Sequence, residues 1–296
     1  AVDYLPGTSK YLYTADQGGN ENDHIYLQSP GDTSAKDLTP WMGSTNSMYG
    51  WSDDKKSLYL VSNQRNPRYF DLWKMDTASW NATLFYQNDS GYSPGAMSAS
   101  ERYLALSKTI TTDKNELYLY DRTDKSMKRI SNDNEATWNA TGFEKNDSIM
   151  YYTTNDGSEF SYVVKYNINS GAAEKYFSDE WDVNFMLISD HEKYHTIFIN
   201  ADGKNKVLLF DHATNKAVSF PEIKDGDVKS VNISPTEKNM LLTVGSSRSP
   251  DNLYSYNFET KTLKQLTQTL NKEVDENDLV SATVVRFKSF DGKEIP

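Results

Sequence analysis

A short strand-like segment recurs six times along the chain at an almost constant spacing. In each copy a polar turn leads into apolar residues, as in Asp53–Asn63 (DDKKSLYLVSN) and Pro235–Val244 (PTEKNMLLTV). The apolar parts begin near Tyr11, Leu58, Tyr103, Ile149, His195 and Met240, so the spacing stays between 45 and 47 residues. A fixed period of this length indicates a repeat architecture in which each copy buries its faces against its neighbours.

Each copy contains further segments of the same kind. One lies before the recurring segment (SMYGWS, FMLIS, SVNIS), one follows it (DLWKMD, ELYLYD, NLYSYN), and another comes after a second turn. We name the four segments a, b, c and d in chain order. Four short strands in about 45 residues are typical of a propeller blade. The sequence therefore predicts an all-β fold, a β-propeller of four-stranded antiparallel blades, with six repeats visible and seven if the first is truncated.

The repeat also predicts the domain boundaries. A propeller over residues 1–270 is expected to precede a different segment, 271–296. The expected blades are 1–43, 44–89, 90–134, 135–179, 180–223 and 224–270.

The connections between the strands fall into two classes. In an up-and-down blade, the a–b and c–d turns share one face and the b–c and d–a loops share the other. The a–b turns are short and similar (SDDKKS, SASERY, EKNDS), whereas the b–c loops are irregular and are expected to be longer (NQRNPRYF, NDGSEFSY, GSSRSPD). Function tends to lie on variable loops that a rigid scaffold holds. We therefore expect the working surface on the b–c/d–a face.

Composition excludes several classes of function. A net charge of −11 and the lack of a Lys/Arg cluster argue against nucleic acid as a partner. The absence of cysteine excludes disulfides, thiolate metal sites and a Cys nucleophile, and it leaves the compartment open between the bacterial periplasm and the cytoplasm. No apolar stretch has the length of a membrane helix, so no membrane partner is expected.

The sequence contains a literal G-x-S-x-G at Gly91–Gly95, which in a hydrolase marks the nucleophile elbow. The residue after the nucleophile must donate its backbone N–H to the oxyanion hole, and Pro94 has none. The motif is also expected in a d–a loop that leads into a strand, not into a helix. We therefore do not assign Ser93 a catalytic role.

Metal and cofactor sites are not predicted. The four histidines, at 24, 191, 195 and 212, form no HxH or HxxxH pair. The Asp-rich turns lack the ligand spacing of a calcium loop, and turn chemistry explains them. No glycine-rich phosphate loop is present, so no cofactor is expected.

Charged and aromatic residues on the expected b–c/d–a face are the remaining candidates. Arginine there has the chemistry to bind a carboxylate, and Asp or Glu to hold a free amino terminus. A solvated rim with stacked aromatic rings is the simpler interpretation of each single residue. The candidates for a substrate gate or rim are Arg65, Arg68, Glu159 and Arg248 in b–c loops, and Trp41, Glu135, Trp138, Trp181 and Asp182 in d–a loops.

The end of the chain departs from the repeat. Val284–Phe290 alternates like a strand and meets Asp291-Gly292, a hairpin signal. This run, DENDLVSATVVRFKSFDGKEIP, resembles the junction in the prolyl oligopeptidase family of serine peptidases, where a propeller continues into an α/β-hydrolase domain. The blades SNQRNPRYFDLWKMD and TTNDGSEFSYVVKYN resemble propellers of its dipeptidyl-peptidase and acylaminoacyl-peptidase-like members. Residues 271–296 are then expected to be a linker and the first strand of a truncated hydrolase domain.

The resemblance implies a hydrolase domain downstream that carries a Ser-Asp-His triad, so the propeller alone should be inactive. It also implies that the propeller caps the active site and admits short peptides. In dipeptidyl-peptidase relatives an Arg in an early b–c loop and a Glu pair grip the substrate's amino terminus. Arg65 or Arg68 matches that Arg by location, and no Glu-Glu pair stands in a d–a loop, so the resemblance does not extend to the Glu pair. Propellers of this family commonly have seven or eight blades, against six repeats here.

Two other functions stay open on the sequence. One is a freestanding, TolB-like propeller whose b–c/d–a face binds protein or peptide partners. The other is a propeller that binds a glycan or metabolite through its tryptophans.

Overall fold

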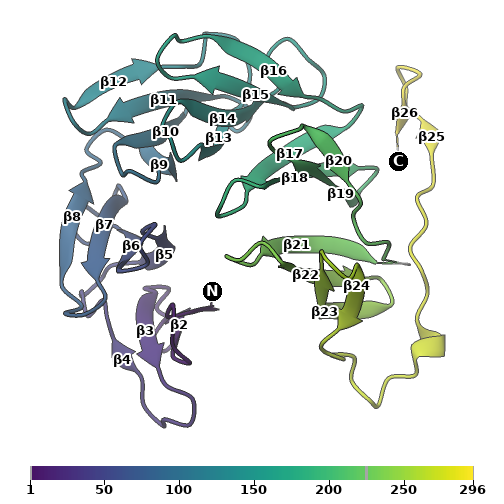
Figure 1. Ribbon diagram of the computed structural model, residues 1–296, viewed down its shortest axis with the longest axis horizontal. Coiled ribbons are helices and arrows are strands. Elements are labelled where there is room, and N and C mark those ends of the chain that lie inside the picture. Colours follow the sequence, from purple (N-terminus) through teal and green to yellow (C-terminus); the bar gives the residue numbers. More distant parts are fainter. Residues whose placement is uncertain (1, 224–225, 296) are drawn as a thin grey trace. The chain divides into compact units, whose positions relative to one another are not determined.

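The computed structural model describes residues 2–223 and 226–295, and nearly all of their regular structure is β-strand (Figure 1). Six four-stranded sheets, one two-stranded sheet and one 3₁₀ turn lie in these ranges. In each four-stranded sheet, strands that follow one another in the chain pair antiparallel. The fold is a β-propeller of six four-stranded antiparallel blades, as the repeat predicts. The chain divides into two compact units, residues 1–133 and 134–296, which we describe separately.

The first unit holds blades 1 to 3. Its strands are β1 (Val2–Tyr4), β2 (Tyr11–Ala15), β3 (His24–Gln28) and β4 (Lys36–Asp37) in blade 1; β5 (Asn46–Trp51), β6 (Ser57–Ser62), β7 (Asp71–Asp76) and β8 (Ala82–Tyr86) in blade 2; and β9 (Ser93–Met97), β10 (Tyr103–Thr109), β11 (Asn115–Asp121) and β12 (Ser126–Arg129) in blade 3.

The second unit holds blades 4 to 6 and the terminal segment. Its elements are β13 (Trp138–Phe143), β14 (Ile149–Thr154), β15 (Tyr162–Asn167) and β16 (Ala173–Phe177) in blade 4; β17 (Asp182–Ile188), β18 (Tyr194–Ala201), β19 (Lys204–Asp211) and β20 (Lys216–Val218) in blade 5; β21 (Asp227–Ile233), β22 (Asn239–Ser246), β23 (Ser249–Asn257) and β24 (Thr262–Gln265) in blade 6; and then the 3₁₀ turn η1 (Glu276–Asp278), β25 (Phe287–Lys288) and β26 (Glu294–Ile295).

The a–b turns repeat the same hydrogen bonds, which explains their similar sequences. The hydroxyl of the first serine accepts a hydrogen bond from the backbone N–H five residues later. Ser52 accepts from Ser57, and Ser98 accepts from Tyr103. One residue of each turn in blades 2 to 6 adopts a positive φ, between 54° and 65°: Lys55, Glu101, Asp147, Glu192 and Glu237. Short polar sequences tolerate this left-handed backbone.

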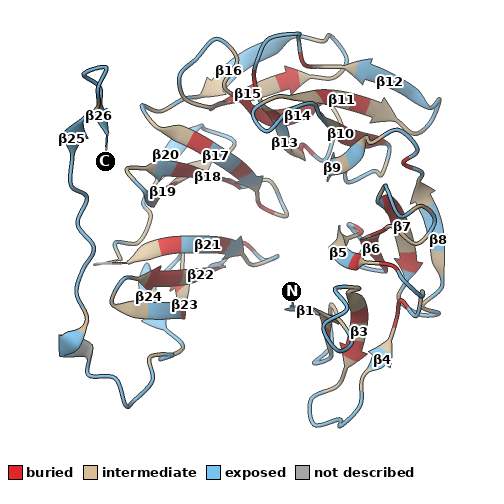
Figure 2. Ribbon diagram, turned by 180° about the vertical axis from the view of Figure 1, so that it is seen from behind, coloured by how far each residue is buried: buried red, intermediate tan, exposed pale blue. Residues whose placement is uncertain are grey.

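The hydrophobic core lies in the seams between blades. Buried leucines of blade 1 pack on Leu58, Leu60 and Met75 of blade 2, and Tyr59 and Leu72 pack on blade 3. In the second unit, separate clusters join blade 4 to blade 5 and blade 5 to blade 6. Figure 2 shows buried residues along the second strand of the blades, such as β14, and exposed ones along outer strands such as β12. Each of these four seams within the units is thus stabilised by apolar side chains from both of its blades.

The terminal segment packs little of its side-chain surface on the propeller. The hairpin β25–β26 turns at Gly292, whose φ is 83°, as the Asp-Gly signal predicts. In the described part of the chain, no helix is long and apolar enough to cross a membrane.

Candidate functional site

The b–c/d–a face contains loops of very different length. The b–c connection of blade 2 runs over residues 63–70, whereas those of blades 5 and 6 are only two residues long, 202–203 and 247–248. The expectation of long b–c loops is therefore wrong for blades 5 and 6. There the residues that looked like loop extend strands β18, β19, β22 and β23 to eight or nine residues.

Arg65 is engaged in the loop of blade 2. Its Nε and Nη2 donate to the two carboxylate oxygens of Asp71, at 2.7 and 2.9 Å, and Nη2 also reaches the carbonyl of Asn88 at 3.0 Å. Asp71 is fully buried and also accepts the backbone N–H of Asn88 at 2.7 Å. The hydrogen bonds to Asp71 raise the pKa of Arg65 above its ordinary value. Arg65 therefore ties the b–c loop to the following d–a loop and is mostly occupied by that task.

Arg68 differs from Arg65 in the same loop. It is exposed, and its backbone N–H donates to Asn66 Oδ1 at 3.0 Å. Its guanidinium forms no hydrogen bond or ion pair with the described residues. Phe70, two residues on, is also exposed. Of the two arginines, Arg68 is the one that presents a cation to solvent on this face.

Asp182 connects two blades. Its Oδ1 accepts the backbone N–H of Ser161, at the end of the blade 4 loop, at 2.9 Å. Asp227, 45 residues later, accepts the N–H of Asn205 in the same way at 2.8 Å. Both aspartates are the first residue of strand a in their blade. Asp182 is therefore one member of a repeated contact that holds neighbouring blades together.

The tryptophan candidates pack into the blades. Trp138 begins strand β13, is 5% exposed and lies 5.6 Å from the ring of Tyr152. Trp181 is half-buried against Phe160, and Trp41 lies 5.4 Å from Trp73 in the seam between blades 1 and 2. These tryptophans form no common aromatic surface within either unit.

The other candidates are spread along the second unit. Glu159 is exposed and lies 3.8 Å from Lys293 Nζ of the terminal hairpin. Arg248 is partly buried, and its backbone N–H donates to Ser246 Oγ at 3.1 Å. Glu135 is exposed before strand β13. Glu135 and Glu159 belong to blade 4, and Arg248 belongs to blade 6.

The terminal segment lies against the b–c loops of all three blades of the second unit. Arg286 forms an ion pair with Asp202 of blade 5, with 2.6 Å between Nη2 and Oδ1. Ala282 donates its N–H to Ser247 Oγ of blade 6 at 2.8 Å, and Lys293 lies near Glu159 of blade 4. In the second unit, the terminal segment thus crosses the b–c/d–a face that the sequence indicates as the working face.

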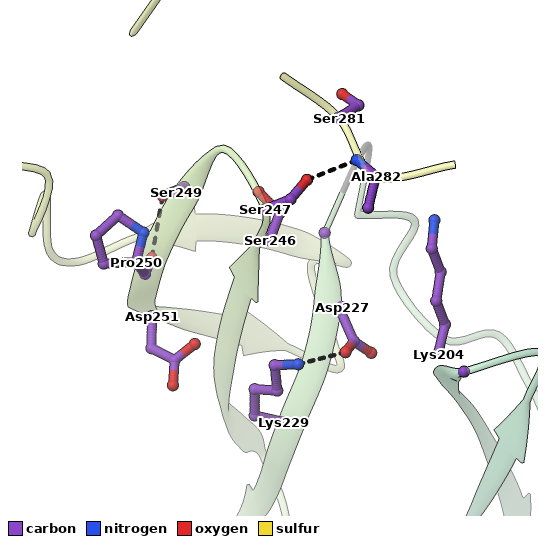
Figure 3. Close-up of a pocket in the computed structure, with 12 residues that line it drawn as sticks. Lys204, Asp227, Lys229, Ser246, Ser247, Ser249, Pro250, Asp251, Ser281 and Ala282 are labelled. Atoms are coloured by element: carbon purple, nitrogen blue, oxygen red, sulfur yellow. Dashed lines mark hydrogen bonds and ion pairs between the residues drawn. The ribbon is translucent and has the colours of Figure 1, made fainter. Parts of the chain in front are cut away.

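A polar pocket of about 320 Å³ lies where this segment meets blades 5 and 6 (Figure 3). Lys229 and Asp227 form an ion pair on its wall, and Ser281 and Ala282 lie along its edge. Lys204, from the b–c turn of blade 5, also lines it. Asp251 also lines the pocket, so its two lysines and two aspartates balance in charge.

The G-x-S-x-G motif is not a nucleophile elbow. Gly91–Gly95 does not form a d–a loop throughout, because Ser93, Pro94 and Gly95 belong to strand β9 of blade 3. The chain then enters the a–b turn and strand β10, with no helix. Among the described residues, no histidine hydrogen-bonds to Ser93, so the structural context rules out the triad chemistry.

Metal chemistry finds no support in residues 2–223 and 226–295, where no cluster of three or more His, Asp or Glu side chains is placed to hold an ion. His24 pairs with Asp37 at 2.7 Å, and His195 is buried.

The sequence reasoning missed a set of glutamates in the a–b turns. Glu237 accepts the N–H of His191 at 2.9 Å and the hydroxyl of Ser189 at 2.5 Å, both from the preceding blade. Glu192 of blade 5 accepts the backbone N–H of Lys145 in blade 4. Glu101 of blade 3 forms an ion pair with Lys74 of blade 2. Their recurrence at one turn position, as in SASER, SDHEK and SPTEK, is the sequence signal that identifies them.

Comparison with known proteins shows which family the chain belongs to. Residues 5–269 match the family described as the prolyl oligopeptidase N-terminal β-propeller domain. Dipeptidyl aminopeptidase BIII from Pseudoxanthomonas mexicana is 39% identical over 88 residues, which are 29% of this chain and 12% of the relative.

Solved structures agree in fold. Prolyl oligopeptidase B from Galerina marginata, bound to a 35mer substrate, has a TM-score of 0.73 at 19% identity and covers 100% of this chain and 45% of its own. TolB from Acinetobacter baumannii is less similar, with a TM-score of 0.56 at 13% identity over 88% of this chain and 64% of its own. This chain spans less than half the length of the two peptidase relatives named here. It belongs to the prolyl oligopeptidase N-terminal β-propeller family.

Proposed function

We propose that the chain is the non-catalytic propeller of a serine peptidase. In this proposal a C-terminal α/β-hydrolase domain hydrolyses peptides, and the propeller restricts entry to short ones. The family description supports it, because it refers to an N-terminal domain of prolyl oligopeptidase. Residues 271–296 would then be the linker and the first strand of that hydrolase domain.

The observation that carries the proposal is the chemistry of the terminal segment. Val280 and Val285 are 78% and 72% exposed, and Phe287 and Phe290 of the hairpin also face solvent. An isolated two-stranded hairpin is marginally stable in water, and a row of exposed apolar side chains marks an interaction surface. Since the segment crosses the b–c loops of blades 4 to 6, a domain packed on it would cover the b–c/d–a face of that unit.

Activity measurements test the proposal. Residues 1–296 should hydrolyse no peptide, whereas the parent protein should hydrolyse short peptides and lose that activity when its hydrolase-domain serine is replaced. The parent should cleave a peptide of a few residues much faster than one of about 30 residues. A parent reading frame that encodes no hydrolase domain after these residues would contradict the proposal.

Arg68 is our proposed substrate contact on this face. An exposed guanidinium suits a peptide carboxylate or carbonyl oxygen, and the neighbouring Phe70 offers an apolar contact. An exposed guanidinium beside an exposed aromatic ring is not found at the other candidates, which are Glu159, Arg248, Trp138, Trp181 and Asp182. In the parent enzyme, Arg68→Gln should raise KM for short peptides severalfold and leave the melting temperature unchanged. An unchanged KM would remove Arg68 from the substrate path.

A second candidate is a freestanding interaction module. The b–c/d–a face of the first unit exposes Met42, Phe70 and Ile110, which a protein partner would cover. The TolB-like fold also agrees with this function. Stoichiometric capture of one partner by residues 1–296, abolished by Phe70→Ser and Ile110→Ser, would favour it over the peptidase proposal.

A further inference from the structure

The seam between blades 4 and 5 contains a fully buried histidine. His195 in strand β18 lies with its ring 5.3 Å from Tyr151 and 5.6 Å from Tyr176, which belong to strands β14 and β16 of blade 4. Tyr176 Oη lies 2.8 Å from His195 Nδ1 and donates to Asn215 Oδ1 at 3.0 Å. Because the tyrosine proton goes to Asn215, His195 Nδ1 carries a hydrogen that it donates to the tyrosine oxygen. In the neutral imidazole, Nε2 is then the nitrogen without a hydrogen.

The other ring nitrogen of His195, Nε2, lies in surroundings that disfavour its protonation. No hydrogen-bond partner of His195 Nε2 lies in the described part of the chain. The paired residues on either side, Ile188 in strand β17 and Phe210 in strand β19, are apolar. Protonation would therefore bury an N–H that donates to nothing, at a cost that neutral histidine avoids.

The charged groups around the seam also oppose a proton on His195. The ring of His212, from the c–d turn of blade 5, lies 4.4 Å away, and Lys165 of strand β15 adds positive charge. The buried Glu144, from the a–b turn of blade 4, accepts the hydroxyl of Tyr151 at 3.0 Å and lies 3.9 Å from His212 Nε2. Glu192, from the a–b turn of blade 5, accepts the N–H of Lys145. Both carboxylates are thus engaged elsewhere.

We propose that His195 is a proton-sensitive clasp, which holds blades 4 and 5 together at neutral pH and releases their seam in mild acid. When the seam is open, Nε2 meets water and accepts a proton as an ordinary histidine does. When it is closed, the ring stays neutral. Acid therefore favours the open seam.

The size of the response follows from linkage. Burial, with His212 and Lys165, lowers the pKa of His195 from 6.5 to about 3 in the closed seam. The closed form therefore loses stability relative to the open form as the pH falls below 6.5, and the loss is complete near pH 3. Between about pH 7.5 and about pH 5 the ratio of open to closed seam should rise about 30-fold.

Hydrogen exchange of residues 1–296 at these two pH values tests the clasp. After correction for intrinsic exchange rates, peptides from β14, β16 and β18 should open about 30-fold more often at the lower pH, and peptides from β10 should not. His195→Gln, which keeps a hydrogen-bonding group near Tyr176 but does not titrate, should abolish the response. His24→Gln should retain it. The proposal fails if wild type shows no seam-specific increase, or if His195→Gln shows the same increase.

A second measurement does not depend on the folding of the histidine variant. The chain has no cysteine, so Val163→Cys in this seam and Leu106→Cys in the seam of blades 2 and 3 each add a single reporter at a fully buried position. With 4,4′-dithiodipyridine, which reacts with thiols in mild acid, labelling at Val163→Cys should rise relative to Leu106→Cys as the pH falls. An equal pH response of the two sites would overturn the clasp.

Discussion

Glu237 of blade 6 accepts the hydroxyl hydrogen of Ser189 in blade 5 at 2.5 Å. It also accepts the backbone N–H groups of His191 and Lys193. Burial opposes its ionisation, but these hydrogen bonds outweigh burial and lower the pKa of the carboxyl below 4.5. The charged side chain of Glu237, in the a–b turn of blade 6, thus binds the a–b turn of blade 5 through three hydrogen bonds.

Glu237→Gln should lower the free energy of unfolding by about 2 kcal/mol at pH 7, because hydrogen bonds to a charged acceptor are the stronger ones. The folded-state pKa is depressed, so the stabilisation is present above pH 4.5 and is lost as the pH falls through the folded-state pKa. Urea unfolding should therefore show the difference in unfolding free energy between variant and wild type narrowing as the pH falls below 4.5. Glu259→Gln, at an exposed c–d turn, is the control and should change little at either pH.

The two arginines of the blade 2 loop should separate stability from binding. Arg65→Ala leaves the buried Asp71 without its guanidinium and should cost about 3 kcal/mol of unfolding free energy. Arg68→Ala should cost less than about 0.5 kcal/mol. Urea unfolding of both variants, followed by tryptophan fluorescence, measures the difference, and equal losses would contradict the clamp at Arg65.

Trp138 should affect folding and not peptide recognition. Because its indole is buried against Tyr152, Trp138→Ala should lose about 3–5 kcal/mol through lost packing and the cavity left behind. The half-buried Trp181 is the matched comparison, and Trp181→Ala should lose less. Thermal unfolding of the two variants ranks them. A larger loss for Trp181→Ala would show that burial does not set their roles.

Arg286 should hold the terminal segment on blade 5. Arg286→Ala or Asp202→Asn removes the 2.6 Å ion pair and should speed chymotrypsin cleavage after Phe287 or Phe290 about two- to fivefold, as a partly exposed pair of this kind allows. Lys293→Ala breaks only the exposed contact with Glu159 and should leave the cleavage rate nearly unchanged. Timed digestion with gel analysis distinguishes these outcomes.

The blades were predictable because a 45-residue period records a unit that packs against copies of itself. The turn sequences were also informative, since a left-handed residue and a serine recur in the a–b turns of blades 2, 3, 5 and 6. The partner that a given side chain contacts could not be predicted from the sequence. Arg65 and Arg68 are three residues apart and chemically identical, and only the fold brings Asp71 and Asn88 to one of them.

Burial separated the rim candidates in the same way. Trp138 and Asp182 stand before strand-like runs and read as loop residues, but both begin strand a. Their partners, Tyr152 and Ser161, come from another strand and another blade, so the local sequence holds no sign of the contact.

The last strand of each blade leaves one row of backbone groups unpaired, and such edges are where proteins begin to aggregate. Five of the six outermost strands carry a lysine, which discourages pairing with another molecule: Lys36, Lys128, Lys175, Lys216 and Lys264. Strand β8 (ATLFY) carries no charge, and its Leu84 is 40% exposed. Blade 2 therefore has the outer edge that is least protected against pairing with another molecule. Leu84→Lys is the simplest change that would give this edge the same protection as the other five.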